Sequence, residues 1–301
     1  MTPQPRAALV SGATGMRAGD ILLAAFATCI WSGAFVATDA ALREAPPILF
    51  AALRFCLSAL ALAVLPRPRV SWQALLALGL LIGVGQHVGL FLGMATGVTP
   101  GMAALLAHTQ SFFTLALAWG LLGERLTPRK LCGFACALGG LVLLMLERGA
   151  PMPPVAIAIV LGGALAGGAG NFVLRRIGGA DPIGVAAWLS AIAAPILLGL
   201  SLAVEGSAPL LAVLAAPSLA LVAATAYSGI MSGLVAYAIW ARLFGRYEAH
   251  RIAPFMLMVP VGAIALSTLL LGETLGPWRA GAAAAILAGL ALNVPPARQR
   301  R

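Results

Sequence analysis

The sequence predicts an all-α membrane protein with ten transmembrane helices, arranged as two inverted repeats of five helices. Of the 301 residues, 61% are hydrophobic and only 9% are charged, against about 25% charged in ordinary soluble domains. Ten apolar stretches each approach the roughly 20 residues that a helix needs to cross a bilayer. A ten-residue phrase from the middle of the chain also returns near its end. Because so few charged residues cannot cover the surface of a soluble domain of this length, we expect lipid to surround the helices.

The ten expected spans follow the apolar runs in order, with short loops between them. They cover residues 19–42, 46–65, 72–96, 99–121, 127–146, 153–175, 182–204, 216–241, 251–271 and 276–294. The loops leave no room for an extramembrane domain. The first span is longer than the apolar region of a signal peptide and lacks a convincing small-residue cleavage site, so we expect it to be retained.

The orientation of the helices follows from the positions of the basic residues. Fifteen lie on one side of the expected topology, namely Arg6, Arg17, Arg67, Arg69, Arg125, Arg129, Lys130, Arg175, Arg176, Arg242, Arg246, Arg251, Arg298, Arg300 and Arg301. Three lie on the opposite side, Arg43, Arg148 and Arg279, and Arg54 falls inside the second span. Loops rich in Lys and Arg stay in the cytoplasm. We therefore expect both termini to be cytoplasmic, in a multi-pass protein of a bacterial-type inner (cell) membrane.

The repeated phrase divides the chain into two related halves. LLGERLTPRK at 121–130 and LLGETLGPWR at 270–279 are offset by 149 residues, which places Glu124 on Glu273 and aligns a proline in each copy. Each copy holds five spans, and because five is odd, the second copy enters the membrane from the opposite face. Such an inverted repeat is typical of secondary transporters, whose substrate site lies near the midplane between the halves. Chance similarity between Ala/Leu/Gly-rich helices is the alternative, and the shared Gly-Glu pair and proline argue against it.

The expected organisation therefore has four parts. They are a cytoplasmic N-terminal segment (1–18), a first five-helix repeat (19–148), a second, inverted five-helix repeat (149–295) and a basic cytoplasmic tail (296–301). Glu124 and Glu273 stand in the last hairpin of each repeat, just before a helix begins, where exposed N–H groups favour a carboxylate. Because this places them at the membrane surface, we interpret both as structural residues.

These features together resemble a known family of transporters. Ten spans in a 5+5 inverted repeat, a Gly-Glu hairpin between the last two spans of each half, and Arg54 in the second span resemble the drug/metabolite transporter superfamily, EamA type, over essentially the whole chain. Within it, the length, Trp31 and the Gln86-His87 pair are similar to the YddG branch of amino acid exporters. The resemblance implies export through a pore formed mainly by spans 1, 3, 4, 6, 8 and 9, with spans 5 and 10 peripheral.

The third span carries both a packing surface and a candidate cavity surface. Glycines at intervals of four form a smooth ridge for another helix, namely Gly85, Gly89, Gly93 and Gly97. In an α-helix His87 lies about 200° round from Gly85, on a stripe with Phe91 and Met94. Since a lipid-facing His is costly, that stripe is expected to face a protected or watery interior. A structural His bonded to a carbonyl of a neighbouring helix is the alternative.

Candidate cavity residues on the other spans are aromatic, amide, hydroxyl or sulfur-containing, and they bring little fixed charge. They are Trp31, His108, Gln110, Thr114, Asn171, Tyr227 and Met231. Taken singly, the residues on the fourth, sixth and eighth spans favour contact between helices, whereas Trp31 fits a cavity wall and core packing equally. As a set they predict a cavity with aromatic, methionine and amide surface.

Three further residues inside the spans have distinct expected roles. Pro254 and Pro260 each remove a backbone hydrogen bond from the ninth span, so we expect this span to bend and gate one side. Arg54 is the one charge well inside a span, and we interpret it as structural, reaching the outer surface or a carboxylate such as Asp39. Capture of a substrate carboxylate is the alternative for Arg54.

The expected substrate follows from the charges that the cavity lacks. The candidate midplane residues include no Asp or Glu, although a cationic drug calls for a carboxylate and a phosphorylated solute calls for several basic groups. We therefore expect a neutral or zwitterionic metabolite with an apolar side chain, which agrees with the amino acids, aromatic and other neutral ones, that the resemblance implies. His87 or His108 could carry a proton, and simple facilitated movement is equally consistent.

Other functions stay open as alternatives. These are export of nucleobase- or purine-type metabolites or of cationic drugs, a passive channel or lipid scramblase, and, more remotely, an intramembrane hydrolase, which is disfavoured because no G-x-S-x-G motif is present. We expect no enzyme activity, cofactor, metal site, nucleic-acid partner or obligate protein partner. The expected partners are the lipid bilayer and a small-molecule substrate.

Overall fold

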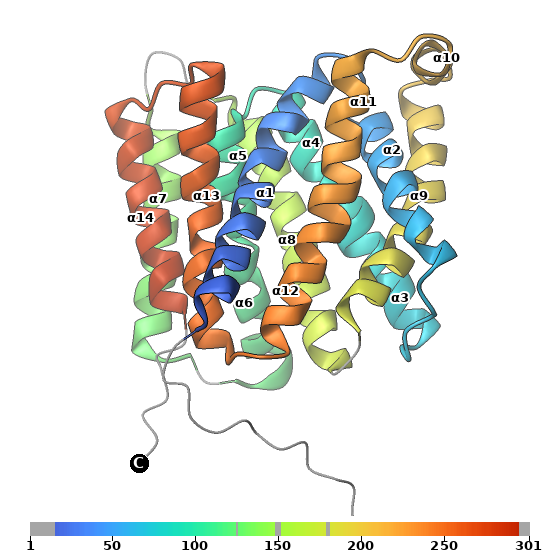
Figure 1. The fold of residues 1–301 in the computed structure, drawn as a ribbon. Helices are drawn as coiled ribbons and strands as arrows, with labels where there is room; N and C mark the ends of the chain where they lie inside the picture. Colours follow the sequence, from blue (N-terminus) through green and yellow to red (C-terminus); the bar gives the residue numbers. More distant parts are fainter. Residues whose placement is uncertain (1–15, 125, 148–151, 179–180, 295–301) are drawn as a thin grey trace, which may run out of the picture.

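A computed structural model describes residues 16–124, 126–147, 152–178 and 181–294, and these residues form helices and connecting turns with no strand. In chain order the elements are α1 (Ala18–Leu42), α2 (Pro47–Ala59), η1 (Leu60–Ala63), α3 (Trp72–Leu78), η2 (Gly79–Gln86), α4 (His87–Ala95), α5 (Pro100–His108), α6 (Gln110–Leu122), α7 (Pro128–Met145), α8 (Pro154–Ile177), α9 (Pro182–Val204), α10 (Ala208–Ala215), α11 (Leu219–Ala226), η3 (Tyr227–Val235), α12 (Ala236–Phe244), α13 (Ala249–Leu271) and α14 (Pro277–Asn293) (Figure 1). Most of the N-terminal segment, the basic tail, and Arg6, Arg125, Arg148, Arg298, Arg300 and Arg301 lie outside the described residues.

The expected class of an all-α membrane protein is confirmed, although the count of ten full-length spans is not exact. Eight helical segments of the described chain are long and apolar enough to cross a bilayer. The other two expected spans correspond to the shorter apolar helix Pro47–Leu62 and to α14, which has 17 residues. One further helix was not expected from the sequence: α10 lies across one end of the bundle (Figure 1).

The two copies of the repeated phrase form matching hairpins. Gly123 ends α6 with φ of 65°, and Gly272 ends α13 with φ of 69°, a left-handed conformation that glycine adopts without strain. Pro128 and Pro277 then occupy the first turns of α7 and α14, where the missing N–H costs nothing. The same local chemistry therefore turns the chain at the end of each half.

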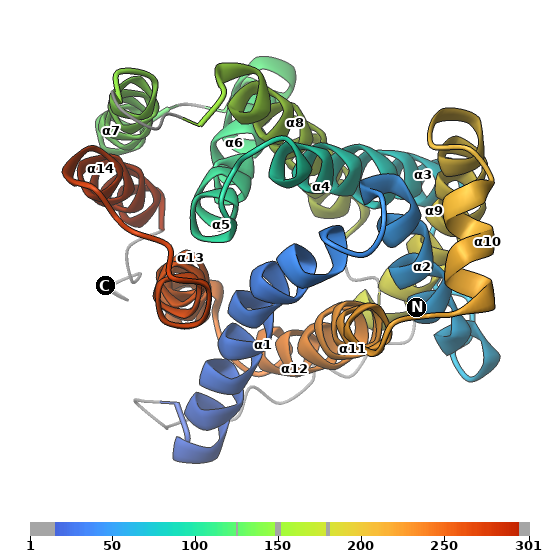
Figure 2. The same cartoon turned by 90° about the horizontal axis from the view of Figure 1, so that it is seen from above.

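The packing of α7 on α14 shows the two-fold relation between the halves. A Cβ on Gly140 would lie 2.8 Å from the Ala282 carbonyl oxygen, and a Cβ on Gly289 would lie 2.5 Å from the Gly133 carbonyl oxygen. The offset of 149 residues exchanges these two contacts, since it relates Gly140 to Gly289 and Gly133 to Ala282. Small residues at the crossing let the two backbones touch. The α7–α14 pair stands at one side of the bundle, and α2 packs on α9 at the other side (Figure 2).

The third and eighth spans each contain a π-helical stretch at matching positions. η2 covers Gly79–Gln86 and η3 covers Tyr227–Val235, which the repeat offset superimposes to within one residue. Because a π-helix bonds each residue to the fifth one along instead of the fourth, side chains within Gly79–Gln86 are shifted around the helix axis from their places in a regular α-helix. π-Helical turns are frequent at functional sites; here η2 packs against α8 and α9, and η3 packs against α1 and α2.

The glycines of the third span approach α8. A Cβ on Gly89 would lie 2.6 Å from Gly163 Cα, and a Cβ on Gly85 would lie 2.9 Å from Ala166 Cβ. Gly93 likewise contacts Val160 and Ala156 of α8, and Gly97, with φ of 120°, lies beside Pro153 just before that helix begins. The absence of side chains along this face therefore allows α4 and α8 to touch backbone to backbone.

Candidate functional site

Arg54 lies midway along α2 and is buried, with 8% of its surface exposed. Its guanidinium carbon lies 5.0 Å from the centre of the Phe55 ring and 5.9 Å from the centre of the Phe91 ring. Its Nε is buried without a hydrogen-bond partner in the described structure. Asp39, the partner expected from the sequence, instead bonds Arg43 of its own helix at 2.8 Å. The expectation that Arg54 reaches Asp39 or the surface is therefore wrong.

His87 is half-buried at the junction of η2 and α4, next to the same two phenylalanines. Its Nδ1 lies 2.8 Å from the Ile82 carbonyl oxygen, five residues back, which the π-helical turn makes reachable. Its ring meets Phe55 edge-on at 4.8 Å and Phe91 at 5.6 Å between centres. Because a carbonyl oxygen only accepts, Nδ1 carries the proton, and in the neutral ring Nε2 is then free to accept. The alternative role for His87, a bond to a neighbouring helix, is thus replaced by a bond within its own span.

An aromatic group from α1 and α12 stands near Arg54. Trp31 meets Tyr237 edge-on at 5.4 Å and stacks on Trp240 at 5.6 Å, and its Nε1 donates to the Ser232 carbonyl at 3.1 Å. Tyr237 exposes 37% of its surface although it interacts electrostatically with buried Arg54. Tyr237 therefore has an open face next to Trp31 and within electrostatic range of Arg54.

Several candidate residues are engaged in contacts between helices instead. Gln86 Nε2 donates to Gln110 Oε1 at 3.1 Å, and Thr114 Oγ1 donates to the Gly168 carbonyl at 3.0 Å. Tyr227 donates its hydroxyl to the Ile30 carbonyl at 3.0 Å. These bonds join η2 to α6, α6 to α8 and η3 to α1. Their groups already have protein partners, so this arrangement favours the interhelical role that the sequence left open.

The remaining candidates occupy varied positions. Phe91 and Met94 are buried, and Met94 belongs to the main apolar core. His108 bonds the Ala104 carbonyl of its own helix at 2.8 Å. Asn171 of α8 and Met231 of η3 are half-buried. Of the sequence-predicted set, the structure therefore brings Trp31, His87 and Phe91 around Arg54 and Tyr237, and leaves His108, Gln110 and Thr114 near α6.

The two glutamates related by the repeat have different environments. Glu273 is buried, accepts from Thr99 Oγ1, and accepts from the Gly101 N–H at 3.1 Å. It therefore joins the end of α13 to the beginning of α5. Glu124 lies at the opposite end of the bundle and pairs with Arg175 at 2.5 Å, with 31% of its side chain exposed.

The ninth span is a continuous helix despite its prolines. Pro254 is exposed and Pro260 is buried within α13. Two hydroxyls of α1 bond carbonyls of α13: Thr28 donates to Phe255 at 3.1 Å, and Ser32 donates to Val259 at 2.9 Å. These bonds tie α13 to α1 beside both prolines.

Sequence reasoning missed three residues of this architecture. Phe55 contacts Arg54, and Tyr237 interacts with it electrostatically. Nothing in the sequence distinguishes either one from the other aromatic residues of the apolar runs. Glu205, after α9, accepts from the Ile48 and Leu49 N–H groups at 2.8 and 2.9 Å. The start of α2 has no capping side chain of its own, and that was the one local signal that a distant acceptor was needed.

An all-helical bundle of two inverted halves is an architecture typical of membrane transporters. The chain belongs to the EamA-like transporter family, which matches residues 19–146 and 154–294, one match in each half. It is therefore a multi-pass membrane transporter and not an enzyme, and the resemblance to the drug/metabolite transporter superfamily is confirmed.

Relatives of the chain include proteins described as exporters. It is 34% identical to a probable amino-acid metabolite efflux pump of Salmonella typhimurium and 32% identical to one of Escherichia coli, covering 94% of this chain and 97% of each relative. It is 24% identical to a probable terminal-alkyne amino-acid exporter of Streptantibioticus cattleyicolor, covering 87% of this chain and 89% of that protein. A crystal structure of a protein 22% identical has the same fold, with a TM-score of 0.61 over 92% of this chain and 96% of that one.

Proposed function

We propose that this transporter exports small neutral or zwitterionic metabolites of the amino acid class by alternating access, through a cleft beside Arg54 and Tyr237. The names of its relatives support export of amino acids. The inverted repeat supports alternating access, because two half-bundles of the same fold can rock about a shared site.

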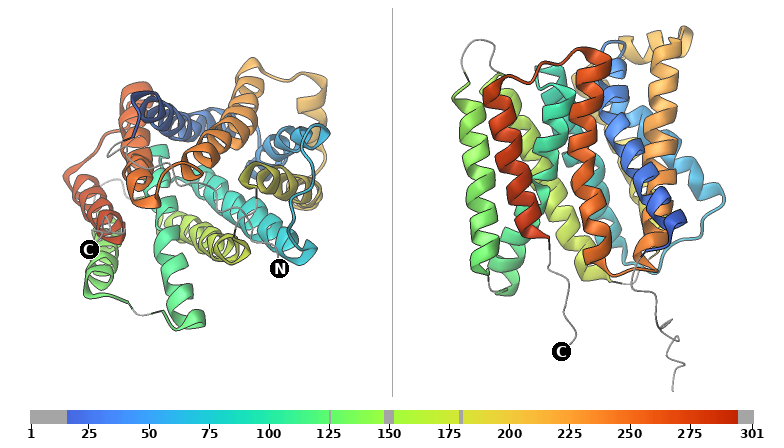
Figure 3. Two further views of the ribbon diagram at one scale, coloured as in Figure 1. Left: turned by 60° about the horizontal axis from the view of Figure 1, so that its bottom comes forward. Right: turned by 60° about the vertical axis from the view of Figure 1, so that its left-hand side comes forward.

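Unequal closure of the two ends is the observation that carries the proposal. At one end Glu273 joins α13 to α5, and these helices pack together. At the other end Glu124 holds Arg175 of α8 instead, and α6 lies apart from α13 (Figure 3). The position that corresponds to Thr99 in the second repeat is Glu248, an acid that cannot replace the hydroxyl donor. One end is therefore shut while its counterpart is not, as expected for one state of an alternating-access cycle.

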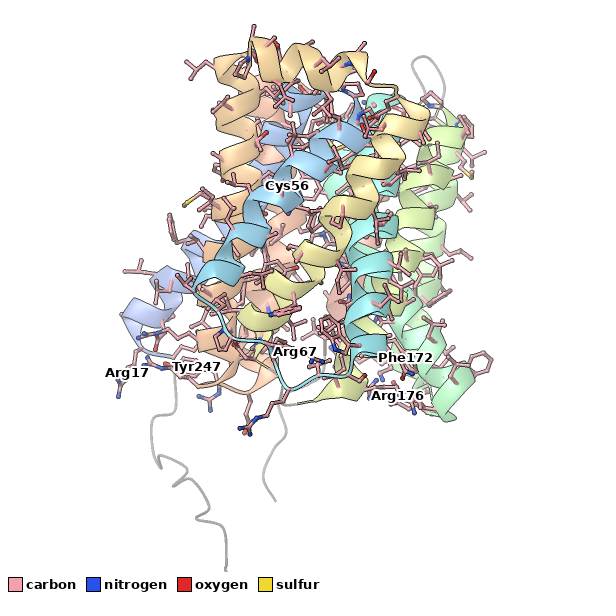
Figure 4. All side chains as sticks on the ribbon, turned by 90° about the vertical axis from the view of Figure 1, so that its right-hand side faces the viewer. Arg17, Cys56, Arg67, Phe172, Arg176 and Tyr247 are labelled. Carbon is pink, nitrogen blue, oxygen red and sulfur yellow. The ribbon has the colours of Figure 1, made fainter. Side chains whose placement is uncertain are left out.

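The open end is the cytoplasmic end under the proposed orientation. Arg17, Arg67 and Arg176 lie together at that end of the bundle (Figure 4), and all three belong to the basic set expected in the cytoplasm. Tags placed at the two termini test this orientation. Access of both tags from the cytoplasmic side alone is expected, and access of either one from outside would contradict it.

The distribution of carboxylates favours an uncharged or zwitterionic substrate over a cation. The chain has nine Asp and Glu residues. Each of them lies within four residues of a helix end or between helices, from Asp20 at the start of α1 to Glu273 after α13. A permanently cationic drug would therefore meet no carboxylate midway across the bundle, where a partner stabilises it most.

Counterflow in proteoliposomes tests the proposal. Purified protein is reconstituted, loaded with unlabelled solute and assayed for uptake of labelled amino acids, nucleobases and cationic compounds. We expect saturable uptake of neutral amino acids that unlabelled amino acids compete away. Exchange of nucleobases or cations alone would refute the amino acid assignment, and uptake that neither saturates nor is competed would identify a passive channel.

The same assay addresses proton coupling. If a proton moves through the imidazoles, replacing His87 and His108 by Asn abolishes the pH dependence of flux. If the pH dependence survives the double substitution, coupling through these two residues is excluded.

A further inference from the structure

We infer that Arg54 binds the carboxylate of the transported solute, so that the substrate is a monocarboxylate, such as an amino acid zwitterion, whose apolar part lies against Trp31 and Tyr237. This inference rests on the proposed transport function and names the group that recognises the substrate.

Arg54 lacks a counter-charge among the described residues. A buried cation without an anionic partner is strongly unfavourable, so it persists only where an anion binds or a function requires it. The carboxylates on neighbouring elements are engaged elsewhere: Asp39 bonds Arg43, and Glu205 accepts from the Ile48 and Leu49 N–H groups. Within the described residues, no carboxylate pairs with Arg54, and its Nε has no hydrogen-bond partner. The neutralising anion therefore comes from outside the protein.

The Arg54 side chain points into the bundle. Cys56, two residues further along α2, points away from the bundle and is exposed (Figure 4). Two residues are about 200° apart on an α-helix, so Arg54 points inward, in agreement with its burial. There it meets Phe91 from α4 and interacts with Tyr237 from α12. A carboxylate in the cleft beside Tyr237 would thus lie within reach of the guanidinium.

The residues and helices around Arg54 hold its side chain in place. Phe55 and Phe91 hold the guanidinium by cation–π contact, which leaves its N–H groups free to bind a carboxylate with two parallel hydrogen bonds. α2 is held closely against η3, because Ser58 donates to the Gly229 carbonyl at 2.8 Å and a Cβ on Gly229 would lie 2.9 Å from the Arg54 carbonyl oxygen. Arg54 is therefore held in place before a ligand arrives, as an efficient binding residue requires.

The aromatic residues near Arg54 favour a ligand that has an apolar part. Tyr237 keeps more than a third of its surface open beside the edge-on and stacked rings of Trp31 and Trp240. An apolar group next to a carboxylate would cover this aromatic surface. A ligand with both features, and without a net positive charge, fits a neutral amino acid better than a nucleobase or a cationic drug.

Counterflow with matched ligands and variants tests the inference. The amino acid that the wild-type protein exchanges fastest is compared, as a competitor, with its own carboxamide and with sodium chloride and sodium phosphate. The variants are Arg54→Gln, Arg54→Lys and, as a control for loss of a positive charge, Arg43→Gln at an exposed ion pair. Thermal unfolding reports on whether each variant is folded.

We expect the wild-type protein to prefer the amino acid over its carboxamide. Loss of a charge-assisted pair should raise the half-saturating concentration of the amino acid about tenfold to a hundredfold in Arg54→Gln, with little change for the carboxamide. Arg54→Lys should be intermediate, because a lysine keeps the charge but not the planar fork. Arg43→Gln should match the wild type. Arg54→Gln should unfold at the wild-type temperature or above, because it removes an unpaired buried charge.

Other results would overturn the inference. Equal competition by amino acid and carboxamide in the wild type does so without any variant. So does unchanged amino acid affinity in Arg54→Gln, or an equal loss for acid and carboxamide with a lowered unfolding temperature, which indicates a structural role. Competition by chloride or phosphate as strong as that by the amino acid would assign Arg54 to inorganic anions instead. If the wild type exchanges no amino acid at all, the proposed function fails, and this inference fails with it; exchange that is indifferent to Arg54 refutes only the inference.

Discussion

We predict that Glu273→Gln destabilises the protein more than its control, Glu124→Gln. The two glutamates occupy equivalent positions in the repeats but differ in burial and in hydrogen-bond partners. Glu273 is buried and accepts from Thr99 Oγ1 and the Gly101 N–H at the start of α5. Glu124 is partly exposed and pairs with Arg175. Gln keeps the shape of each side chain and removes its charge. The two variants therefore separate the role of the charge from the role of the hairpin.

The expected magnitudes differ because of burial. A hydrogen bond to a charged group contributes about 1.5–3 kcal/mol, and a carboxylate at a helix N-terminus adds up to about 2 kcal/mol in partly buried sites. Since the amide oxygen of Gln can still accept one bond, we expect Glu273→Gln to cost about 2–3 kcal/mol. An exposed ion pair such as Glu124–Arg175 contributes about 0–1 kcal/mol.

Hydrogen exchange of the first turn of α5 measures this difference directly. A loss of about 2 kcal/mol in the closed end should speed exchange of the Gly101 amide about 30-fold in Glu273→Gln, because that amide donates to Glu273. Glu124→Gln should leave the exchange rate unchanged and should lower the unfolding temperature less. Equal effects of the two variants, or a Gly101 amide indifferent to Glu273→Gln, would refute the assignment of Glu273 as the residue that holds this end closed.

Three more predictions concern packing and motion. Replacing both Pro254 and Pro260 by Ala restores backbone bonds in α13 and should lower flux without unfolding the protein; unchanged counterflow would count against gating by this helix. Gly89→Ala should destabilise by about 1–3 kcal/mol, because the added methyl meets the backbone of α8, whereas Gly162→Ala enters open space and should leave the unfolding temperature unchanged; equal effects would contradict the close approach. Glu205→Gln should cost about 2–3 kcal/mol and speed exchange at the start of α2, since Glu205 accepts two of its amides; unchanged exchange there would show that this cap contributes little.

The general architecture was predictable because its signals are local or repeated. A run of about 20 apolar residues is enough to indicate a helix in lipid, and glycine and proline in the repeated phrase indicate where each helix ends and the next begins. The offset between Glu124 and Glu273 relates the halves without any knowledge of contacts. The second span and α14 are shorter than expected, and α10 was missed, because eight apolar residues in a loop carry no clear signal of a separate helix.

The partners of individual polar residues were not predictable in the same way. The sequence offers Asp39 two possible partners, Arg43 and Arg54. It bonds Arg43 because the two residues are one helical turn apart and because α2 turns Arg54 inward. The π-helical turn before His87 has no sequence pattern of its own, and it moves the imidazole to a carbonyl five residues back. Glu205 reaches the start of α2 from a point more than 150 residues away.

The sequence alone determines that this is an all-helical membrane protein with two inverted halves, that it belongs to a transporter family, and that its midplane is poor in carboxylates. These properties depend on composition, length and repetition along the chain. Only the tertiary structure decided that Arg54 has no counter-charge among the described residues, that Phe55 and Phe91 hold its guanidinium, and that Glu273 joins two helices whereas Glu124 pairs with an exposed arginine. These properties depend on distances between elements remote in sequence, and two chemically identical glutamates acquire different roles only when the helices around them are placed.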